Sequence, residues 1–207
     1  MPFVSRNELF QNRVIVGVWK ITESLSELHS HIRLSEVDQE RFFIRKKEKH
    51  QKSFLASRIL LKQMGIDLDD LYYKNQTIPM LKSGKNISIS HTNDYVVISL
   101  SIKHQIGIDI ERHHSRITKL AYKFTNSKDG NCTNSLDLIK HLTRLWVAKE
   151  AIYKAMKKEG ISFKNQMTIH YEKQSGTGKF FFEENQILFD LYFKEIDTYS
   201  LCVCMRT

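Results

Sequence analysis

The sequence predicts an α+β protein whose chain is organised as two related halves. Residues alternate between apolar and polar with a period of two in three parts of the chain, which is typical of strands. Between these parts lie two long stretches with the 3.6-residue period of amphipathic helices. The resulting order is strand, helices, strands, helix, strands, and no exact sequence repeat accompanies the similar order of the two halves.

The first helical region is predicted to follow an early strand at 14–22. Ser35 can cap a helical span over 36–64, and Gly65 can end it. The span is long, and we expect the basic run RKKEKHQK at 45–52 to mark a break between two helices. A solvated helix face is the simpler interpretation of the charge in that run.

The middle of the chain is predicted to form three strands. They are NISIS at 86–90, YVVISLS at 95–101 and QIGIDIE at 105–111, with a short turn at Lys103–His104.

The C-terminal region begins with residues 112–137, which are polar and predicted to be irregular. A strong helix is expected over 136–158, and strands are expected over 167–205. Within the latter, SGTGK at 175–179 and EENQ at 183–186 are interpreted as turns.

The composition limits the class of protein and of partner. The 207 residues are 41% hydrophobic and 27% charged, which suffices for one core or for two small halves packed together. Lys and Arg number 32 against 23 Asp and Glu, and this basic balance suits nucleic acid, anionic membrane, polyphosphate or an acidic protein. Three cysteines without metal-site spacing predict reduced thiols. With no apolar leader or membrane-length run, we expect a soluble, cytoplasmic protein.

The run IGIDIE at 106–111 carries two acids on one face of its strand. Three isoleucines alternate with Gly107, Asp109 and Glu111, so the two carboxylates lie about 7 Å apart. Carboxylates on one face repel each other unless a positive charge lies between them. That charge could come from water and a surface lysine, or from a metal ion.

The predicted helix at 136–158 contains LWVAKEAIYKA, with a lysine inside its apolar stripe. Lys149 lies near the middle of the stripe, and Glu150 lies at its edge between Trp146 and Lys154. Burying an ammonium group without a partner is expensive, so Lys149 must extend to solvent or meet an anion. In an isolated helix, a snorkelling lysine and a surface Glu–Lys pair would be the ordinary interpretation.

The strand ISISHT at 87–92 ends in Ser90 and His91. A lone histidine at a strand end is usually structural, but this Ser–His corner could bind a phosphate. Two acids on a strand and one on a helix could form a Mg²⁺ site that substrate phosphates complete, with Lys149, Lys154 and His91 around them. The residues therefore predict a Mg²⁺-dependent enzyme acting on a phosphate or pyrophosphate, and they leave the substrate open.

These three motifs, in this order and at these separations, resemble those of the 4′-phosphopantetheinyl transferases. The resemblance covers residues 86–155, and the basic helix FLASRILLK extends it upstream. It is closer to the surfactin-synthetase-activating type than to the short trimeric type. It implies two similar α+β halves related by a pseudo-twofold axis, which we place at 1–104 and 105–207. The active site would lie between them in a monomer.

The resemblance also implies the reaction and the roles of individual residues. A member of this family transfers 4′-phosphopantetheine from coenzyme A to a serine of an acyl or peptidyl carrier protein, releasing adenosine 3′,5′-bisphosphate. The implied roles are Mg²⁺ binding by Asp109, Glu111 and Glu150; general base, directly or through water, by Glu150; phosphate contacts by Lys154 and His91; contacts near the 3′-phosphate by Ser90 and Arg58; and support from Lys149.

The sequence departs from the family pattern at three places. Thr77-Ile78-Pro79 stands where the family has Gly-Lys-Pro, and we expect Lys82, rather than Lys74 or Lys85, to replace the missing phosphate contact. Val147 replaces a small hydroxyl residue. The stretch after the IGIDIE run lacks the usual aromatic pair and acid, which leaves the choice of carrier protein open.

Two other functions compete with the transferase. A metal-dependent nuclease also needs acids and positive charge, but DIER lacks the strand lysine typical of that class, and no aromatic basic strip offers stacking for bases. A carrier-binding module with a dead site would have no reason to keep Asp109, Glu111, Glu150 and Lys154. We therefore expect an acidic carrier protein and coenzyme A as partners, without nucleic acid or membrane.

Overall fold

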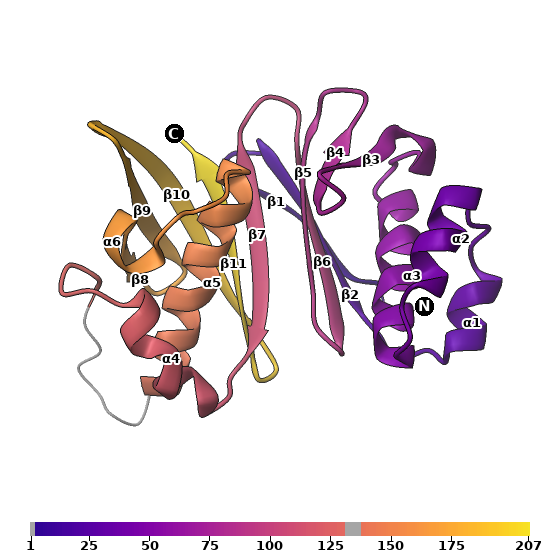
Figure 1. The fold of residues 1–207 in the computed structure, drawn as a ribbon, viewed down its shortest axis with the longest axis horizontal. Helices are drawn as coiled ribbons and strands as arrows, with labels where there is room; N and C mark the ends of the chain where they lie inside the picture. Colours follow the sequence, from indigo (N-terminus) through magenta and orange to yellow (C-terminus); the bar gives the residue numbers. More distant parts are fainter. Residues whose placement is uncertain (1–2, 131–137) are drawn as a thin grey trace.

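The chain folds into two antiparallel sheets that pack face to face, with helices covering both outer faces (Figure 1). This computed structural model describes residues 3–130 and 138–207. The helices are α1 (Leu25–Ser30), α2 (Glu36–Phe43), α3 (Glu48–Gln63), α4 (Arg116–Phe124), α5 (Leu138–Met156) and α6 (Phe163–Gln166), with a short 3₁₀ turn at Leu68–Asp70. The fold class is α+β, as predicted from the sequence.

The first sheet has the strand order β1-β2-β6-β5, and helices α1 to α3 cover its outer face. Its strands are β1 (Phe3–Leu9), β2 (Val14–Lys20), β5 (Asn86–His91) and β6 (Tyr95–Ser101). A separate hairpin of β3 (Leu71–Lys74) and β4 (Ile78–Leu81) lies between α3 and β5 in the chain.

The second sheet has the strand order β7-β11-β10-β9-β8, and α4 to α6 cover its outer face. Its strands are β7 (Ile106–Arg112), β8 (Met167–Glu172), β9 (Ser175–Phe182), β10 (Asn185–Ile196) and β11 (Tyr199–Arg206). The chain thus crosses from one sheet to the other at 102–105. The division into similar halves at 1–104 and 105–207 stays a prediction.

Three hydrophobic clusters hold these layers together. One lies between the first sheet and its helices, and one lies between the second sheet and its helices. The third fills the contact between the sheets with valine, isoleucine and leucine side chains from β2, β6, β7 and β11. Both faces of β6 and β7 are therefore buried, which explains why YVVISLS and the first part of IGIDIE are so apolar.

The elements predicted before residue 112 are confirmed. The Ser35 side chain caps α2 by accepting a hydrogen bond from the Asp38 backbone N–H. The helical span is broken at 44–47, within the region where the basic run begins, and Gly65 follows α3 with a φ of +79°. The strands expected at 14–22, 86–90, 95–101 and 105–111 are β2, β5, β6 and β7.

Two predictions for the C-terminal region are wrong. Part of 112–137 is helical, because Ile117, Ala121 and Phe124 recur at helical spacing and pack into the second core as α4. SGTGK is not a turn but the beginning of β9, and Lys173, with a φ of +51°, lies in the turn that precedes it. The EENQ turn is confirmed at Glu183–Glu184, and the helix expected from 136 is described from 138 onward as α5.

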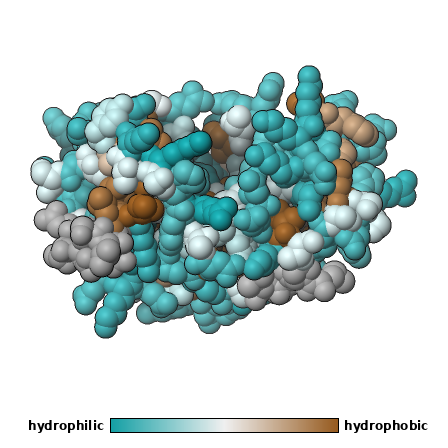
Figure 2. Space-filling model, turned by 90° about the horizontal axis from the view of Figure 1, so that it is seen from below, coloured by the Kyte–Doolittle hydropathy of each residue, from teal (hydrophilic) through white to brown (hydrophobic). Residues whose placement is uncertain are grey.

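No helix in the described part of the chain is long and apolar enough to cross a membrane. Seen from below in Figure 2, the surface is mostly hydrophilic, with separate hydrophobic patches.

Candidate functional site

The candidate site lies where the edge strands of the two sheets meet. β5 is the last strand of the first sheet, β7 is the first strand of the second, and side-chain bonds join them. The Ser88 hydroxyl accepts a hydrogen bond from the Ile108 backbone N–H at 3.1 Å. The Ser90 hydroxyl donates to Asp109 Oδ1 at 2.7 Å. The Ser–His corner and the IGIDIE acids, separated by the β6 strand in the sequence, are therefore brought together.

Helix α5 approaches β7 closely because residue 107 has no side chain. A Cβ atom on Gly107 would lie 1.8 Å from the Ala151 carbonyl oxygen, a distance that no real contact allows. This close packing brings Lys154 to Asp109, and the ammonium Nζ lies 2.6 Å from Asp109 Oδ1. Glu150, one turn before Lys154, lines the same cleft.

One side of the cleft, which we call the carboxylate wall, is formed by Asp109, Glu111 and Glu150. Asp109 is 3% exposed, and its Oδ2 atom is buried without a hydrogen-bond partner in the described residues. Loss of solvent in the cleft, followed by the charge of Asp109, raises the pKa of Glu111 to about 7 and that of Glu150 to about 7. Three acids with one lysine among them form an electrostatically unsatisfied group.

The opposite side, the arginine wall, is formed by Arg41, Arg45 and Arg58 with the rings of Phe54 and Tyr73. The Arg41 guanidinium lies 3.8 Å from the centre of the Tyr73 ring, and Arg45 lies 4.4 Å from that of Phe54. Arg41 also donates to the Gln76 carbonyl oxygen at 3.1 Å, while its Nε is buried without a partner in the described residues. Loss of solvent and the neighbouring Arg41 and Arg58 lower the pKa of Arg45.

Arg58 belongs to this wall but is already neutralised. It is 1% exposed, and its Nε and Nη2 atoms donate to both carboxylate oxygens of Asp38 at 2.9 and 2.8 Å. Nη1 donates to the Ser57 hydroxyl at 3.1 Å. Arg58 therefore holds α2 against α3. Arg41 and Arg45 are the cations of this wall that remain available to bind a ligand.

The two walls enclose a cleft of about 520 Å³. The structure brings seven of the predicted site residues to it: Arg58, Ser90, His91, Asp109, Glu111, Glu150 and Lys154. The pKa of His91 is lowered, first by loss of solvent and then by the charges of Lys154, Arg45 and His50. Its imidazole therefore lies in positive surroundings, as an anion site requires.

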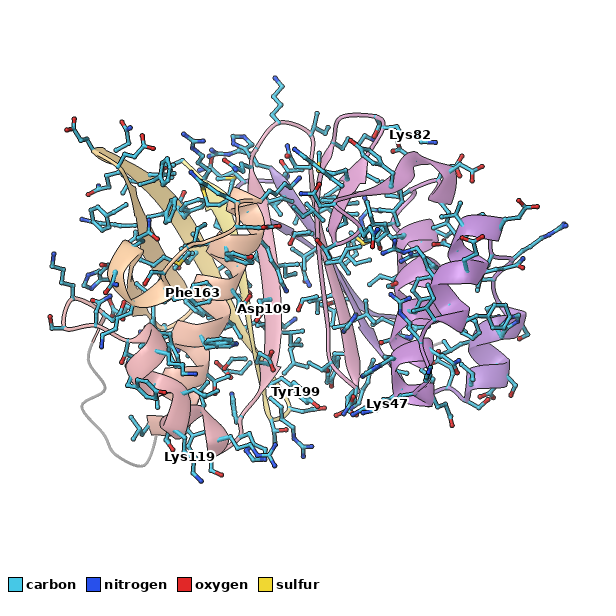
Figure 3. The ribbon with its side chains drawn as sticks, viewed as in Figure 1. Lys47, Lys82, Asp109, Lys119, Phe163 and Tyr199 are labelled. Carbon is cyan, nitrogen blue, oxygen red and sulfur yellow. The ribbon has the colours of Figure 1, made fainter. Side chains whose placement is uncertain are left out.

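Two predicted site residues do not reach the cleft. Lys82 is exposed on the loop after β4, where its backbone N–H donates to the Asp70 carbonyl oxygen, and Figure 3 shows it far from Asp109. Lys149 is fully buried on the other side of α5 and meets an anion there, since Nζ donates to Asp129 at 2.7 Å. Its Nζ also donates to the Phe124 carbonyl oxygen at 2.6 Å, so it secures the end of α4.

Arg41 and Arg45 were missed in the sequence analysis. Their four-residue spacing at the end of α2 places both on one side of the helix end, and Arg45 begins the run interpreted there as a helix break or solvated face. The aromatic residues on which the two arginines stack, Phe54 and Tyr73, could have identified them. However, both lie in other elements, and only the fold brings them near the arginines.

The carboxylate wall suits a divalent cation by its chemistry. Hard cations such as Mg²⁺ take carboxylate oxygens as ligands, and the buried, unpartnered Oδ2 of Asp109 is such an oxygen. Within 3–130 and 138–207, however, no group of three or more His, Cys, Asp or Glu side chains is already arranged to hold a metal ion. Lys154 instead takes the other oxygen of Asp109.

A comparison with known proteins identifies a family that part of the chain resembles. Residues 105–204 match the family model of the 4′-phosphopantetheinyl transferase superfamily. No curated protein sequence matches the chain. The matched region contains β7 and α5, and so it includes all three acids of the carboxylate wall and Lys154. Over residues 105–204 the chain is therefore similar to the 4′-phosphopantetheinyl transferase superfamily.

Proposed function

We propose that this protein transfers 4′-phosphopantetheine from coenzyme A to a serine of an acidic carrier protein. One observation carries the proposal: the cleft sets an arginine wall against a carboxylate wall, and each has a buried polar atom without a partner in the described residues. A substrate with several phosphates and a divalent cation would satisfy both atoms. The family match supports phosphopantetheine transfer in general, and the resemblance to the surfactin-synthetase-activating type supports the carrier protein as acceptor.

The arginine wall would bind the nucleotide end of coenzyme A. Arg41 and Arg45 lie over aromatic rings with their guanidinium groups toward the cleft, in the place where Lys82 was expected to act. We assign them to the 3′-phosphate, together with Ser90 and His91 on the neighbouring strand. Arg58 would act by holding this wall in place through its ion pair with Asp38.

The carboxylate wall would act on the pyrophosphate. Asp109, Glu111 and Glu150 would hold Mg²⁺, which supplies positive charge to neutralise the pyrophosphate oxygens. Lys154, released from Asp109 or shared with it, would donate to a phosphate oxygen. The serine hydroxyl of the carrier protein forms a bond to the phosphorus that bears pantetheine. The bond from that phosphorus to the bridging oxygen breaks, and adenosine 3′,5′-bisphosphate leaves with that oxygen.

Glu150 would take the proton of the attacking serine, directly or through a water molecule. Burial and the charge of Asp109 raise its pKa to about 7 in the metal-free protein, and Mg²⁺ beside it would lower that pKa, so the carboxylate would be deprotonated and able to accept a proton near neutral pH. A second cavity of about 360 Å³ shares Thr77, Pro79, Ile89 and Lys154 with the cleft. Its apolar wall includes Ile78, which stands where the family has a lysine, and we assign the cavity to the pantetheine arm.

The direct test is intact-mass spectrometry of an apo acyl carrier protein and an apo peptidyl carrier protein, each incubated with this protein, coenzyme A and Mg²⁺. We expect at least one carrier to gain the mass of one phosphopantetheine group. A carrier whose acceptor serine is replaced by alanine is the control and should gain nothing. Unchanged masses for both carriers, with the enzyme folded and Mg²⁺ present, would contradict the proposal.

A further inference from the structure

Two tyrosines and two aspartates join the sheets below the cleft, and the proposed chemistry uses none of them. Tyr95 begins β6 in the first sheet, and its hydroxyl donates to Asp197 in the β10–β11 turn at 2.6 Å. Tyr199 begins β11 in the second sheet, and its hydroxyl donates to Asp94 in the β5–β6 turn. Each sheet thus supplies one tyrosine and one aspartate. We call these four residues the tyrosine–aspartate clasp, and Figure 3 shows Tyr199 below Asp109.

The clasp is compact and well buried at its centre. The two tyrosine rings pack edge to face with their centres 5.1 Å apart, and the residues are 2% and 4% exposed. Asp197 is also 2.9 Å from the ammonium group of Lys20 on β2. Burial and then the hydrogen bond to Asp94 raise the pKa of Tyr199 to about 12. The hydroxyl therefore stays protonated and remains a donor over the whole neutral range.

Both tyrosines lie beside strand positions that pair with site residues. Tyr95 immediately precedes Val96, which is the register partner of His91 on β5. Tyr199 immediately precedes Ser200, which is the register partner of Glu111 on β7. The clasp therefore connects the end of the strand that carries the Ser–His corner to the end of the strand that carries the acids.

The rest of the contact between the sheets is mainly apolar. Its core consists of aliphatic side chains such as Val16, Val97, Ile108 and Val203, whose contacts have no preferred direction. Such contacts hold the two layers together but set no angle between particular atoms. Hydrogen bonds constrain both distance and angle, so the two reciprocal bonds at this end fix the offset of the sheets together with the Ser88–Ile108 and Ser90–Asp109 bonds at the cleft.

We propose that the tyrosine–aspartate clasp positions the two walls of the cleft for the transfer reaction. The arginine wall, with Ser90 and His91, belongs to the first sheet and its helices, and the carboxylate wall belongs to β7 and α5. The distance between a phosphate bound on one wall and the reacting phosphorus held by the other therefore depends on the offset of the sheets. A misplacement of about 1 Å can lower a rate on the order of a hundredfold. This inference rests on the proposed function.

The experiment removes the two hydroxyl groups and keeps the rings. Tyr95→Phe, Tyr199→Phe and the double variant are compared with Ile59→Val, which trims the helical core of the first sheet and leaves the clasp intact. kcat and the KM for coenzyme A are measured well below the unfolding temperature. Asp94→Asn and Asp197→Asn are compared with the corresponding alanine variants, because asparagine keeps an oxygen that accepts the tyrosine hydrogen bond. Hydrogen exchange of the Ile108 amide, which donates across the sheets to Ser88, is followed in each variant.

We expect the double phenylalanine variant to lose kcat by on the order of ten- to a hundredfold. Its KM for coenzyme A should change less than threefold, which corresponds to about 0.7 kcal/mol. The Ile108 amide should exchange faster than in Ile59→Val, and the asparagine variants should keep most of the kcat that the alanine variants lose. A double variant whose kcat and exchange match those of Ile59→Val overturns the inference. If the wild type transfers nothing, the proposed function fails, and the exchange comparison still decides whether the clasp fixes the sheets.

Discussion

The two walls of the cleft differ in how far their charged groups are stabilised by neighbouring residues. On the arginine wall, the guanidinium groups lie over Phe54 and Tyr73, and Arg58 is fully paired with Asp38. On the carboxylate wall, only Asp109 has an ion-pair partner among the described residues, and the pKa values of Glu111 and Glu150 are raised to about 7.

The difference indicates the order in which the walls can be filled. Stacked guanidinium groups stay charged and in place without a ligand, so the first wall is ready for an anion. The acids repel each other until a cation arrives, so the second wall is completed by what the substrate brings with it. Three changes to the chain and one change of pH would break or sharpen this comparison.

The largest effect is expected from Asp109→Asn, which removes the central charge of the carboxylate wall. Loss of this charge should lower the transfer rate on the order of a thousandfold or more, because electrostatic stabilisation at the reacting phosphate is usually the largest catalytic contribution. The fold should persist, since the amide still fills the site. Carrier modification is measured by intact mass, with Asp190→Asn on β10 as the matched control. Wild-type activity in Asp109→Asn would show that this wall carries no charge essential to the reaction.

A large loss of stability is expected from Lys149→Met, behind the same wall. Asp129 is 5% exposed, and the variant would leave its carboxylate buried without its cation. Breaking a buried ion pair in this way costs about 3–5 kcal/mol, to be measured by urea denaturation.

The double variant Lys149→Met with Asp129→Asn is the control, because it removes both charges. It should recover a substantial part of the lost stability. If the single and double variants are equally unstable, the ammonium group matters for its three bonds to backbone carbonyl oxygens and not for its charge.

A moderate and selective effect is expected from Arg45→Gln on the arginine wall. Losing one charge-assisted contact costs about 1.5–3 kcal/mol, so the KM for coenzyme A should rise roughly tenfold or more. The KM for 3′-dephospho-coenzyme A should hardly change if the contact is to the 3′-phosphate. Lys82→Gln is the matched control, since Lys82 lies outside the cleft. The reverse result, with Lys82→Gln weakening coenzyme A and Arg45→Gln having no effect, would return the role to Lys82.

The smallest effect is expected in the pH dependence of the metal-free protein. Glu111 and Glu150 have folded pKa values of about 7, above their ordinary value of 4.5. Between these values the folded state binds more protons than the unfolded chain, so stability falls as the pH rises through this window. Mg²⁺ binding should then strengthen with pH and release protons, which calorimetry in two buffers detects. A Mg²⁺ affinity independent of pH from 5 to 8 would place the cation away from these two acids.

Much of the fold could be predicted because local signals and tertiary packing agree. Ser35 caps a helix in the sequence and in the structure, and YVVISLS is a strand buried on both faces in each. α4 was missed because the polar stretch around it obscured the helical spacing of Ile117, Ala121 and Phe124. The first strand, β1, was missed because its pairing with β2 and not its own pattern makes it a strand.

Site residues, too, could be predicted where a local motif contains them and could not where only the tertiary fold brings them together. Asp109, Glu111, Glu150 and Lys154 could be predicted because each lies in a short motif whose spacing fixes its face. Lys149 lies in the same motif as Glu150 and Lys154, so the sequence predicted it as a site residue too. In the structure its ammonium group instead pairs with Asp129, a loop residue whose position the sequence did not reveal. The arginine wall could not be predicted, since Arg41, Arg45, Phe54 and Tyr73 come from α2, the break after it, α3 and β3, which the tertiary fold brings together.

Gly107 limits how this sequence can change over evolutionary time. A methyl group there would have to displace the backbone of α5, because the obstructing atom is the Ala151 carbonyl oxygen. At Gly17, by contrast, the obstructing atom is the sulfur of Met64, a flexible side chain that can turn aside. Alanine can therefore be tolerated at position 17 but not at position 107. Gly107 sets the spacing between Asp109 and Lys154. Every descendant sequence that keeps this spacing must therefore keep the glycine.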